Sequence, residues 1–452
     1  PTVTNTAFIA ANGTKTTGRT SAPDNLGTQG ATYSFMDMTV YENGLLYNGL
    51  YYVAPTLSTD NSGAYLINNE DDWTNFCDAL YDNGTWNRFS GQTVKLANDI
   101  SVSRMAGYDT HDFLGTFDGQ DNTLTFTATA TASYLAPFRN VLGNSDTDHA
   151  VIHDLNVVTN ITAHDERHTA GLIALVWGYV DVTNCNVTVD ITATKGSTNT
   201  DLYPAGIASQ VVKDAQIAVS GCTVDGTIST DGKYAGGIIG IAQGSATITD
   251  CLSSVTIDSS TDGDGTHGGL VGVQGTYDGS TITIEGCVFN GSLLGASTHS
   301  CGGFVGWRSQ TVNITNSLFV PVQVTINTVD GNTPCATFVR NWTMPDNANC
   351  YYTDALGTPQ GTQAYSINSG ENVIGVYNIS GYTYTYNTSR LYFYNTGFCH
   401  NQGLSTYKQY AAAGDEVHIS ISTTISCADF ITEPAGIKLR SEERRVGKEC
   451  RS

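Results

Sequence analysis

A pattern of 29 to 37 residues is written repeatedly between residues 150 and 340, and internal repeats constrain a fold more than any other sequence feature. Its clearest mark is a column of small or apolar residues: Leu155, Cys185, Cys222, Cys251, Cys287 and Ser317. Apolar residues also lie three and five positions before each member, and a polar pair such as Thr183-Asn184 separates them from the column. Because strand side chains alternate between two faces, an apolar period of two that shifts across Asn, Asp or Gly predicts a strand, a corner and a second strand.

A third apolar segment follows in each repeat, often with paired glycines. Its copies are Ala170-Gly171-Leu172-Ile173, Ala205-Gly206-Ile207-Ala208, Gly236-Gly237-Ile238-Ile239, Gly268-Gly269-Leu270-Val271, Gly302-Gly303-Phe304-Val305 and Ala336-Thr337-Phe338-Val339. Three short strands form one coil, which buries its apolar face by stacking on the next coil at about 4.8 Å. The sequence therefore predicts an all-β fold, a parallel β-helix, right-handed by the general preference of parallel crossovers. A β-propeller would need about 40–50 residues per repeat.

The rest of the chain divides around this β-helix. Residues 1–64 predict a β-rich lead-in, because Asn-Gly pairs at 43–44 and 48–49 favour hairpins. The β-helix is expected over 65–350, opened by an N-terminal capping helix from Asn69 to Gly84 whose Trp73 and Phe76 share one face and cover the edge of the first coil. Residues 351–370 predict a linker, and residues 371–439 predict a small C-terminal all-β module.

The last thirteen residues, 440–452, break with the Thr- and Asn-rich sequence before them and resemble the translation of a sequencing adapter. We therefore exclude them from the fold and expect a metagenomic fragment whose true C-terminus is missing. The formal net charge of the chain is −22, and without the five basic and three acidic residues of this tail it is −24. This excess of acidic residues argues against nucleic acid as a partner. The sequence contains no run of eighteen apolar residues, so we expect no membrane insertion within this chain.

Four of the eleven cysteines occupy the column that faces the core. Their Cβ vectors would run parallel instead of converging, which favours buried thiols that act as small apolar residues. Cys301 and Cys335 share a position before the third segment and are better disulfide candidates, as are Cys399 and Cys427.

The glycine-rich segments resemble a known repeat. Gly-Gly-Ile-Ile-Gly at 236–240, Gly-Gly-Leu-Val-Gly at 268–272 and Gly-Gly-Phe-Val-Gly at 302–306 are similar to the GLUG motif, and residues 113–120 resemble the segment that opens such repeat domains. The resemblance covers roughly residues 65–355. It implies a bacterial protein that is secreted or lies on the cell surface, of adhesin-like type. Such repeats also lie beside the catalytic domain of immunoglobulin-A-cleaving zinc peptidases.

Two clusters contain residue types that bind metals. Asp258, Asp262 and Asp264 crowd one turn and could hold calcium, which takes six to eight oxygen ligands, although an acidic surface turn is the alternative. His164 and His168 are four residues apart, but a zinc peptidase would have Glu directly after the first histidine, where Asp165 stands. We expect a solvated loop there, and no cofactor other than calcium.

Aromatic residues near the third segment predict a ligand-binding surface. Trp177, Trp307 and Tyr203 lie in or beside it, and Lys195 and Tyr203 bound the longest insertion. Loops on a rigid scaffold commonly carry function, whereas singly exposed rings are also ordinary surface features.

From these features we expect a non-enzymatic repeat segment of an adhesin-like protein that presents loops to a host surface protein or a glycan. The first alternative is a carbohydrate-active β-helix enzyme, either a polysaccharide lyase or a hydrolase. A lyase needs a basic residue to abstract a proton, and a hydrolase needs paired carboxylates. The basic residues of the repeats are scattered, and Asp154 and Asp250 would lie roughly 14 Å apart, so we assign no catalytic residue. The second alternative is a non-catalytic spacer of a large zinc peptidase.

Overall fold

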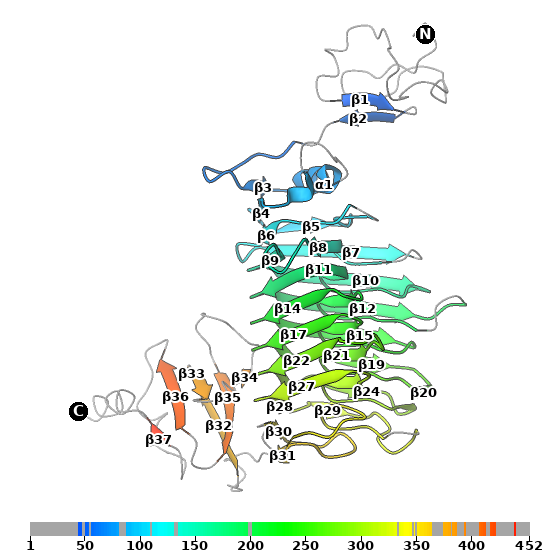
Figure 1. The fold of residues 1–452 in the computed structure, drawn as a ribbon, viewed down its shortest axis with the longest axis vertical. Helices are drawn as coiled ribbons and strands as arrows, with labels where there is room; N and C mark the ends of the chain where they lie inside the picture. Colours follow the sequence, from blue (N-terminus) through cyan, green and yellow to red (C-terminus); the bar gives the residue numbers. More distant parts are fainter. Residues whose placement is uncertain are drawn as a thin grey trace, which may run out of the picture.

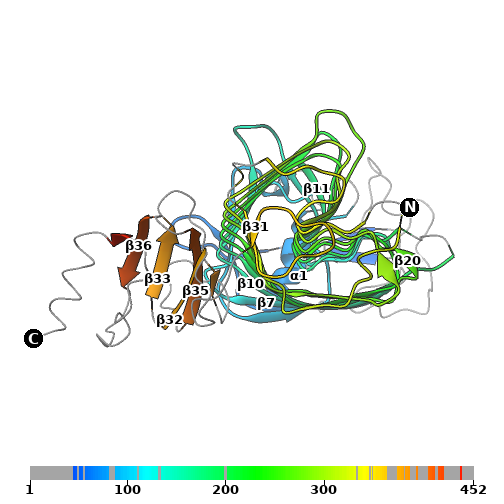
Figure 2. The same cartoon turned by 90° about the horizontal axis from the view of Figure 1, so that it is seen from below.

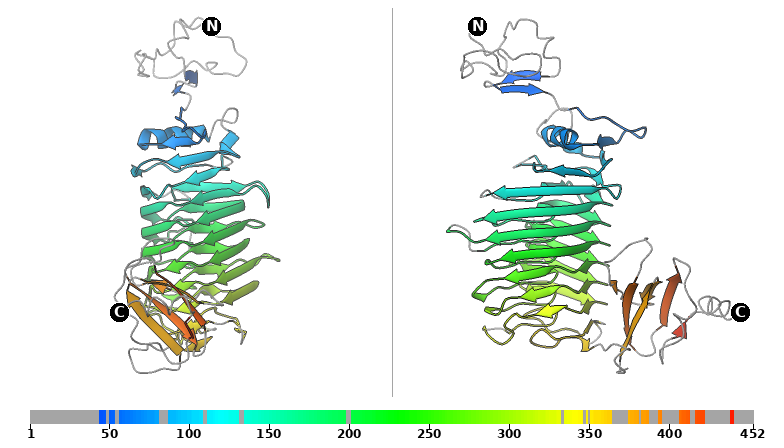
Figure 3. Two further views of the ribbon diagram at one scale, coloured as in Figure 1. Left: turned by 90° about the vertical axis from the view of Figure 1, so that its left-hand side faces the viewer. Right: turned by 180° about the vertical axis from the view of Figure 1, so that it is seen from behind.

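The computed structural model describes residues 56–80, 87–108, 111–130, 134–197, 201–331, 334–345, 348 and 350–363, and the backbone of strands between 44 and 53 and between 374 and 439. The chain winds into a right-handed parallel β-helix whose coils stack from helix α1 to strand β31 (Figure 1). Two further views show the same order of tiers (Figure 3). The predicted fold class is confirmed.

Each coil contributes strands to three faces. The first face holds β3 (Tyr65–Ile67), β4 (Thr93–Leu96), β6 (Thr116–Asp118), β9 (Ala150–His153), the C-terminal half of β11 (Ile173–Thr183), β14 (Gln216–Ser220), β17 (Ser245–Thr249), β22 (Thr281–Glu285) and β27 (Thr311–Thr315). The third face holds β8 (Phe138–Gly143), the N-terminal half of β11, β13 (Ala208–Val211), β16 (Ile239–Ala242), β21 (Val271–Gln274) and β26 (Val305–Trp307). Because β11 belongs to both, these two faces are continuous at that strand.

The second face is the longest. It holds β5 (Ile100–Val102), β7 (Thr123–Ala130), β10 (Asn156–His164), β12 (Asn186–Thr194), β15 (Thr223–Thr230), β18 (Leu252–Ser253), β19 (Thr256–Ser259), β23 (Val288–Phe289), β24 (Ser292–Leu294), β28 (Leu318–Phe319), β29 (Gln323–Val324), β30 (Tyr351–Tyr352) and β31 (Thr362–Gln363). At its far end the short strands β20 (Gly263–Asp264) and β25 (Thr298–His299) pair with each other. Seen along the axis, the coils outline two arms, one near the label β11 and one ending at β20 (Figure 2).

The register of the coils agrees with the repeat read from the sequence. Val180 pairs with Ala150 on one side and Ile217 on the other, and the same ladder continues through Ala246, Ile282 and Val312. The glycine-rich segments form a second ladder in which Gly236 lies between Ala205 and Gly268. All six column residues are 0–1% exposed. Equivalent residues therefore stack on one another in the core, as a parallel β-helix requires.

The corners between the first and second faces explain the polar residue before each column member. That residue has a left-handed backbone in every copy, with φ of 51° at Asp154, 52° at Asn184, 63° at Gly221, 51° at Asp250, 64° at Gly286 and 54° at Asn316. Asn, Asp and Gly are the residues that tolerate this conformation best. The corner predicted at these Asn, Asp and Gly positions is confirmed.

The paired glycines answer a steric demand. A Cβ built on Gly237 would overlap the carbonyl oxygen of Gly269 in the next coil, and one built on Gly269 would overlap that of Gly303. The glycines therefore let the return segment of each coil lie directly on the next.

An aromatic cluster under α1 (Glu70–Ala79) fills the N-terminal end of the solenoid. Asn69 caps the helix by accepting a hydrogen bond from the Asp72 amide at 3.0 Å, as predicted. Trp73 donates through Nε1 to the Arg104 carbonyl at 2.8 Å, and its ring meets Phe117 edge-on at 6.2 Å. The helix ends at Ala79, and Gly84, expected to end it, lies outside the described residues. None of the helices among the described residues is long and apolar enough to cross a membrane.

The described cysteines are buried thiols that form no disulfide with one another. The column thiols do more than fill space: Cys222 Sγ accepts from the Cys185 amide at 3.4 Å and lies 3.6 Å from the Val182 carbonyl, to which it donates. Ser317 takes the same place for the Cys287 amide at 3.2 Å. Cys335 Sγ accepts from the Cys301 amide at 3.2 Å, so this disulfide candidate is present as two thiols. Cys399 and Cys427 lie outside the described residues.

The coils continue past the expected boundary at residue 350. Strands β30 and β31 lie in residues 351–363, where a linker is expected, and extend the second face because a coil needs only two-residue strands in register. Nearer the N-terminus, β1 (Gly44–Tyr47) and β2 (Leu50–Val53) pair antiparallel around residues 48–49.

Beyond the solenoid, two further sheets contain β32 (Ile374–Ser380), β34 (Phe393–Tyr394) and β35 (Thr406–Ala412), and β33 (Tyr382–Tyr386), β36 (Glu416–Ile421) and β37 (Lys438–Leu439). Antiparallel pairing joins β32 to β35 and β33 to β36, so these strands do not repeat the parallel pattern of the coils.

Candidate functional site

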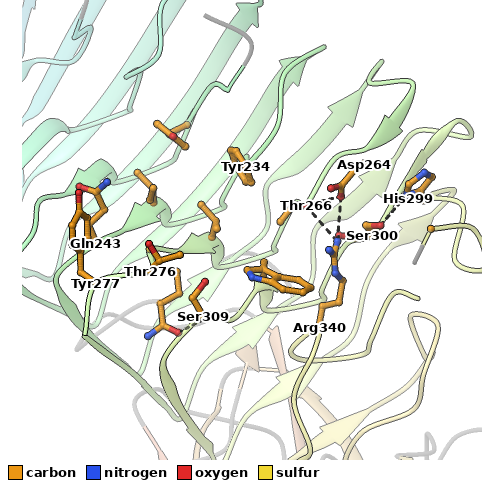
Figure 4. Close-up of a pocket in the computed structure, with 17 residues that line it drawn as sticks. Tyr234, Gln243, Asp264, Thr266, Thr276, Tyr277, His299, Ser300, Ser309 and Arg340 are labelled. Atoms are coloured by element: carbon orange, nitrogen blue, oxygen red, sulfur yellow. Dashed lines mark hydrogen bonds and ion pairs between the residues drawn. The ribbon is translucent and has the colours of Figure 1, made fainter. Parts of the chain in front are cut away.

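A groove of about 830 Å³ lies between the two arms of the coils, toward the C-terminal half of the solenoid. Its floor consists of Ile241, Val273 and Trp307, which occupy one ladder position on β16, β21 and β26. One side, here called the return wall, is formed by Tyr203, Tyr234, Asp264, Thr266, His299, Ser300 and Arg340. The other, called the loop wall, is formed by Gln243, Thr276, Tyr277 and Ser309. Figure 4 shows the labelled members of the two walls on opposite sides of the groove.

The last glycine of each Gly-Gly-x-x-Gly motif sets the angle between floor and return wall. A Cβ on Gly240 would overlap the Tyr203 carbonyl, and one on Gly272 would overlap the Tyr234 carbonyl. Without a side chain at these positions, the return segment packs directly against the third face. The motif that defines the repeat therefore also creates the concave site.

Three residues of the return wall that are not glycine have left-handed backbones. The φ angles are 68° at Tyr234, 49° at Thr266 and 64° at Ser300, and these residues occupy equivalent positions in successive coils. Such conformations cost about 1–3 kcal/mol each and cluster at functional sites. The strained positions therefore coincide with the groove.

Aromatic rings follow the return wall from coil to coil. Tyr203 stacks on Tyr234 with ring centroids 5.5 Å apart, and the stack continues through His168 at 5.4 Å to Tyr134 at 4.9 Å. Across the groove, Tyr277 is 41% exposed. Burial raises the pKa of Tyr234 to about 12, with a further contribution from Asp201, so its hydroxyl stays protonated and can donate a hydrogen bond at neutral pH.

The ionised groups of the groove gather at one end. Arg340 donates through Nη1 to Asp264 Oδ1 at 3.3 Å and to Thr266 Oγ1 at 3.4 Å, and it also contacts the Ser300 carbonyl. Lys233 Nζ lies 3.9 Å from the other Asp264 oxygen. Burial alone would raise the pKa of Asp264, but the hydrogen bond from Thr266 and the charge of Arg340 outweigh it and lower that pKa. Asp264 is therefore ionised at neutral pH.

Glutamine side chains support the loop wall, and that of Gln274 is buried. Gln274 accepts from the Gln310 amide at 2.8 Å and donates to the Thr311 carbonyl at 2.9 Å, and Gln243 accepts from Gln210 at 2.6 Å. Lys213 lies over the Tyr277 ring at 5.7 Å. These contacts hold the loops that follow β16, β21 and β26 in fixed positions.

Two of the four predicted ligand-binding residues line the groove. Tyr203 belongs to the return wall and Trp307 to the floor, whereas Trp177 is 41% exposed on β11 and lies outside it. Lys195 is exposed on its loop, where its amide donates to Asp231 at 2.6 Å. Binding by any of the four stays a prediction.

Sequence reasoning missed the role of Arg340, although a signal existed. Arg340 pairs in register with Gly306, so it replaces the last glycine of the motif in the final copy.

The predicted metal ligands do not form one compact group. Asp264 faces Arg340 and Lys233, and Asp258, Asp262 and Asp264 are not among the described residues whose ligand atoms lie within 4.8 Å of one another. Such a group is formed instead by Asp118, His153 and Asp154, where His153 Nδ1 lies 2.8 Å from Asp154 Oδ2. Cationic neighbours disfavour calcium at Asp264, and the calcium site stays a prediction.

The loop with His164 and His168 is less solvated than expected. Glu166 is 3% exposed and His168 is 7% exposed, because the His168 ring is packed between Tyr134 and Tyr203. Burial lowers the pKa of His168 to about 3, with a smaller contribution from Arg167. His164 instead contacts Thr194 Oγ1 at 3.0 Å. The two histidines therefore have separate surroundings.

Comparisons with known proteins give little beyond this geometry. No protein-family model and no curated protein matches the sequence. One solved structure, of a "putative immunoglobulin A1 protease" from Bacteroides ovatus, is 18% identical and superimposes with a TM-score of 0.41. The match covers 69% of this chain and 87% of that chain. A similarity of this strength assigns no activity, so the fold and the groove define this protein as a parallel β-helix with a polar, aromatic-lined groove.

Proposed function

We propose that this chain is a non-enzymatic segment of a bacterial secreted or cell-surface protein, and that its groove binds a carbohydrate chain. The observation that carries the proposal is the combination of aromatic rings and fixed polar groups in one open groove across several coils. Tyr203, Tyr234, Tyr277 and Trp307 offer ring faces or edges for sugar C–H groups. Thr276, Ser309 and Gln243 offer hydroxyl and amide groups for sugar hydroxyls. Secretion and the adhesin-like role are supported by the resemblance to the GLUG repeat.

The groove chemistry favours binding over cleavage. Hydrolysis of a glycosidic bond normally uses two carboxyl groups, one of them protonated. Among the residues that line the groove, Asp264 is the single carboxylate, and its ion pair with Arg340 keeps it ionised. Asp264 is therefore unsuited to protonate a leaving group.

Glycan-array binding of the full chain, followed by calorimetry on each hit, tests the proposal. We expect at least one oligosaccharide to bind, and we expect Tyr234→Ala and Trp307→Ala each to weaken it at least tenfold. Tyr108→Ala is the control, because Tyr108 is 47% exposed and does not line the groove, and it should leave binding unchanged.

Three results would contradict the proposal. The first is no binding to any glycan, and the second is equal binding by all three variants. The third is release of shortened products from a bound glycan, which would favour the enzymatic alternative.

A further inference from the structure

The side chain of Arg340 occupies a ladder position of the groove that is glycine in the three preceding copies of the repeat. The ladder position of Arg340 is taken by Gly306, Gly272 and Gly240 in the three preceding copies. Of these four copies, the last alone places a side chain there, and that side chain reaches back over two coils to Ser300, Thr266 and Asp264. A departure from a repeat rule inside a groove is more informative than a conforming position, because the repeat itself does not require it.

The guanidinium group of Arg340 is held in one orientation. Its carbon lies 4.5 Å from the centroid of the Trp307 ring, which forms the end of the floor, and the residue is only 7% exposed. The Nη1 atom contacts three other residues of the return wall, Asp264, Thr266 and Ser300. A planar guanidinium fixed by one nitrogen presents its remaining edge in a defined direction.

That remaining edge has unused hydrogen-bonding capacity. Nε is buried without a hydrogen-bond partner, and the contacts of the guanidinium with Asp264, Thr266 and Ser300 all go through Nη1. Leaving a buried charged donor unsatisfied is unfavourable, so an acceptor from outside the protein would stabilise it. The Nε and Nη2 edge matches two parallel hydrogen bonds to a carboxylate or a sulfate.

The local charge is compatible with an anionic ligand, despite the net charge of −22 for the whole chain. Arg340 and Lys233 are two cations around the single carboxylate Asp264, and His299 lies beside them on the return wall. Asp264 contacts only Nη1 of the guanidinium, so this carboxylate does not occupy its other edge.

We propose that the groove selects an anionic sugar, whose carboxylate or sulfate group binds the Nε and Nη2 edge of Arg340 while the sugar ring lies along Trp307. This inference rests on the proposed function and adds the class of carbohydrate. The anionic group anchors one end of the chain, and the following sugars extend along the floor toward Val273 and Ile241.

Three matched pairs of oligosaccharides test the inference by calorimetry with the full chain. Oligogalacturonate is compared with its methyl ester, sialyllactose with lactose, and a sulfated galactan oligosaccharide with its desulfated form. We expect at least one anionic member to bind tenfold or more tightly than its neutral partner. The pair that shows this preference distinguishes a carboxylate from a sulfate ligand.

Variants connect the preference to the guanidinium. Arg340→Gln should reduce the affinity for the anionic member to that for the neutral one, and Arg340→Lys should recover only part, since lysine lacks the bidentate edge. Arg104→Gln removes an equal charge outside the groove, where Arg104 pairs with Asp78, and should change nothing. Thermal unfolding verifies that each variant is folded, and the ligand pairs test the inference even if Arg340→Gln does not fold.

Equal binding of anionic and neutral members would overturn the inference and leave the proposed function standing. Preserved selectivity in a folded Arg340→Gln variant would also overturn the inference. Absence of binding by every member of the set and by every array glycan would overturn both.

Discussion

The two parts of the core, the N-terminal end under α1 and the repeated coils below it, are filled in different ways. At the N-terminal end, single large rings, Trp73, Phe76, Phe113, Phe117 and Phe138, meet with centroids 5.0–6.5 Å apart. In the coils, smaller Val, Ile, Ala and Cys side chains stack in ladders whose members have equivalents above and below. At the end of a solenoid there is no further coil whose equivalent side chains could pack against the last one. Large individual side chains must therefore fill the core at that end.

The largest effect should come from the end of the solenoid. Trp73→Ala removes a fully buried ring and its hydrogen bond to Arg104, and we expect a loss of about 3–5 kcal/mol in the free energy of unfolding. Urea denaturation followed by circular dichroism measures it. Trp177→Ala, on an exposed ring, should cost about 0.5 kcal/mol or less. Similar losses of unfolding free energy in the two variants would contradict the special role of large buried rings at the N-terminal end of the solenoid.

A pH effect should come from the coils. His267 is fully buried, its Nδ1 accepts from the Ala235 amide at 3.1 Å, and its Nε2 lies 2.8 Å from Ser259 Oγ. Burial lowers its pKa to about 4, although the charge of Asp264 opposes the shift. Below the unfolded pKa near 6.5 the unfolded chain gains a proton that the folded chain does not. Stability therefore falls as the pH drops from about 6.5 to about 4, by about 3 kcal/mol from this residue.

The measurement is the midpoint of thermal unfolding at pH 7 and at pH 4.5, for the natural sequence and for His267→Gln. The variant should lose less stability on acidification than the natural sequence does. An unchanged difference between the two pH values would assign the acid sensitivity to other groups, such as His168.

A smaller effect should come from the return segments. Gly237→Ala places a methyl group against the Gly269 carbonyl and the Ser253 hydroxyl, and we expect a cost of about 1–3 kcal/mol by urea denaturation. Gly275→Ala is the milder comparison, because its Cβ would meet Gln243 Cγ at 2.9 Å and Gln243 Cα at 3.0 Å but no carbonyl oxygen of a neighbouring coil. If Gly275→Ala were the more destabilising, backbone contact between coils would not explain the glycine ladder.

The smallest effect should come from Cys222→Ser in the cysteine column, and its comparison with Cys222→Val distinguishes two interpretations of that column. Cys222→Ser retains an acceptor for the Cys185 amide, as Ser317 does for Cys287, and should cost about 1 kcal/mol or less. Cys222→Val keeps the apolar volume but leaves that amide unsatisfied, and should cost about 1–3 kcal/mol. Urea denaturation measures both costs. If Cys222→Ser were the more destabilising variant, the thiols would act only as small apolar residues that fill the core.

Much of the fold was predictable because each coil repeats one local rule. The corner needs a left-handed residue, so Asp154, Asn184 and Gly221 marked it, and the period-two strands beside it fixed the register. The capping helix was visible from Asn69 and the spacing of Trp73 and Phe76. The end of the solenoid was harder, because β30 and β31 are two-residue strands with no apolar period long enough to detect.

The candidate site was only partly predictable. Tyr203 and Trp307 could be named as exposed aromatics, but their meeting in one groove depends on how the return segment folds against the third face. Asp264 was grouped with its sequence neighbours, whereas its partner Arg340 lies 76 positions away along the chain. Sequence proximity was therefore misleading for the charged residues and adequate for the repeated ones.

The sequence by itself determined the coil, because spacing, corner residues and glycines act between neighbours in the chain or between equivalent positions of adjacent repeats. Only the tertiary structure decided the groove, because its walls come from opposite ends of each coil and its charged end joins residues of three different coils. Stacking converts a local period into a fixed register, but the positions of side chains across a concave surface depend on the twist and closure of the whole coil.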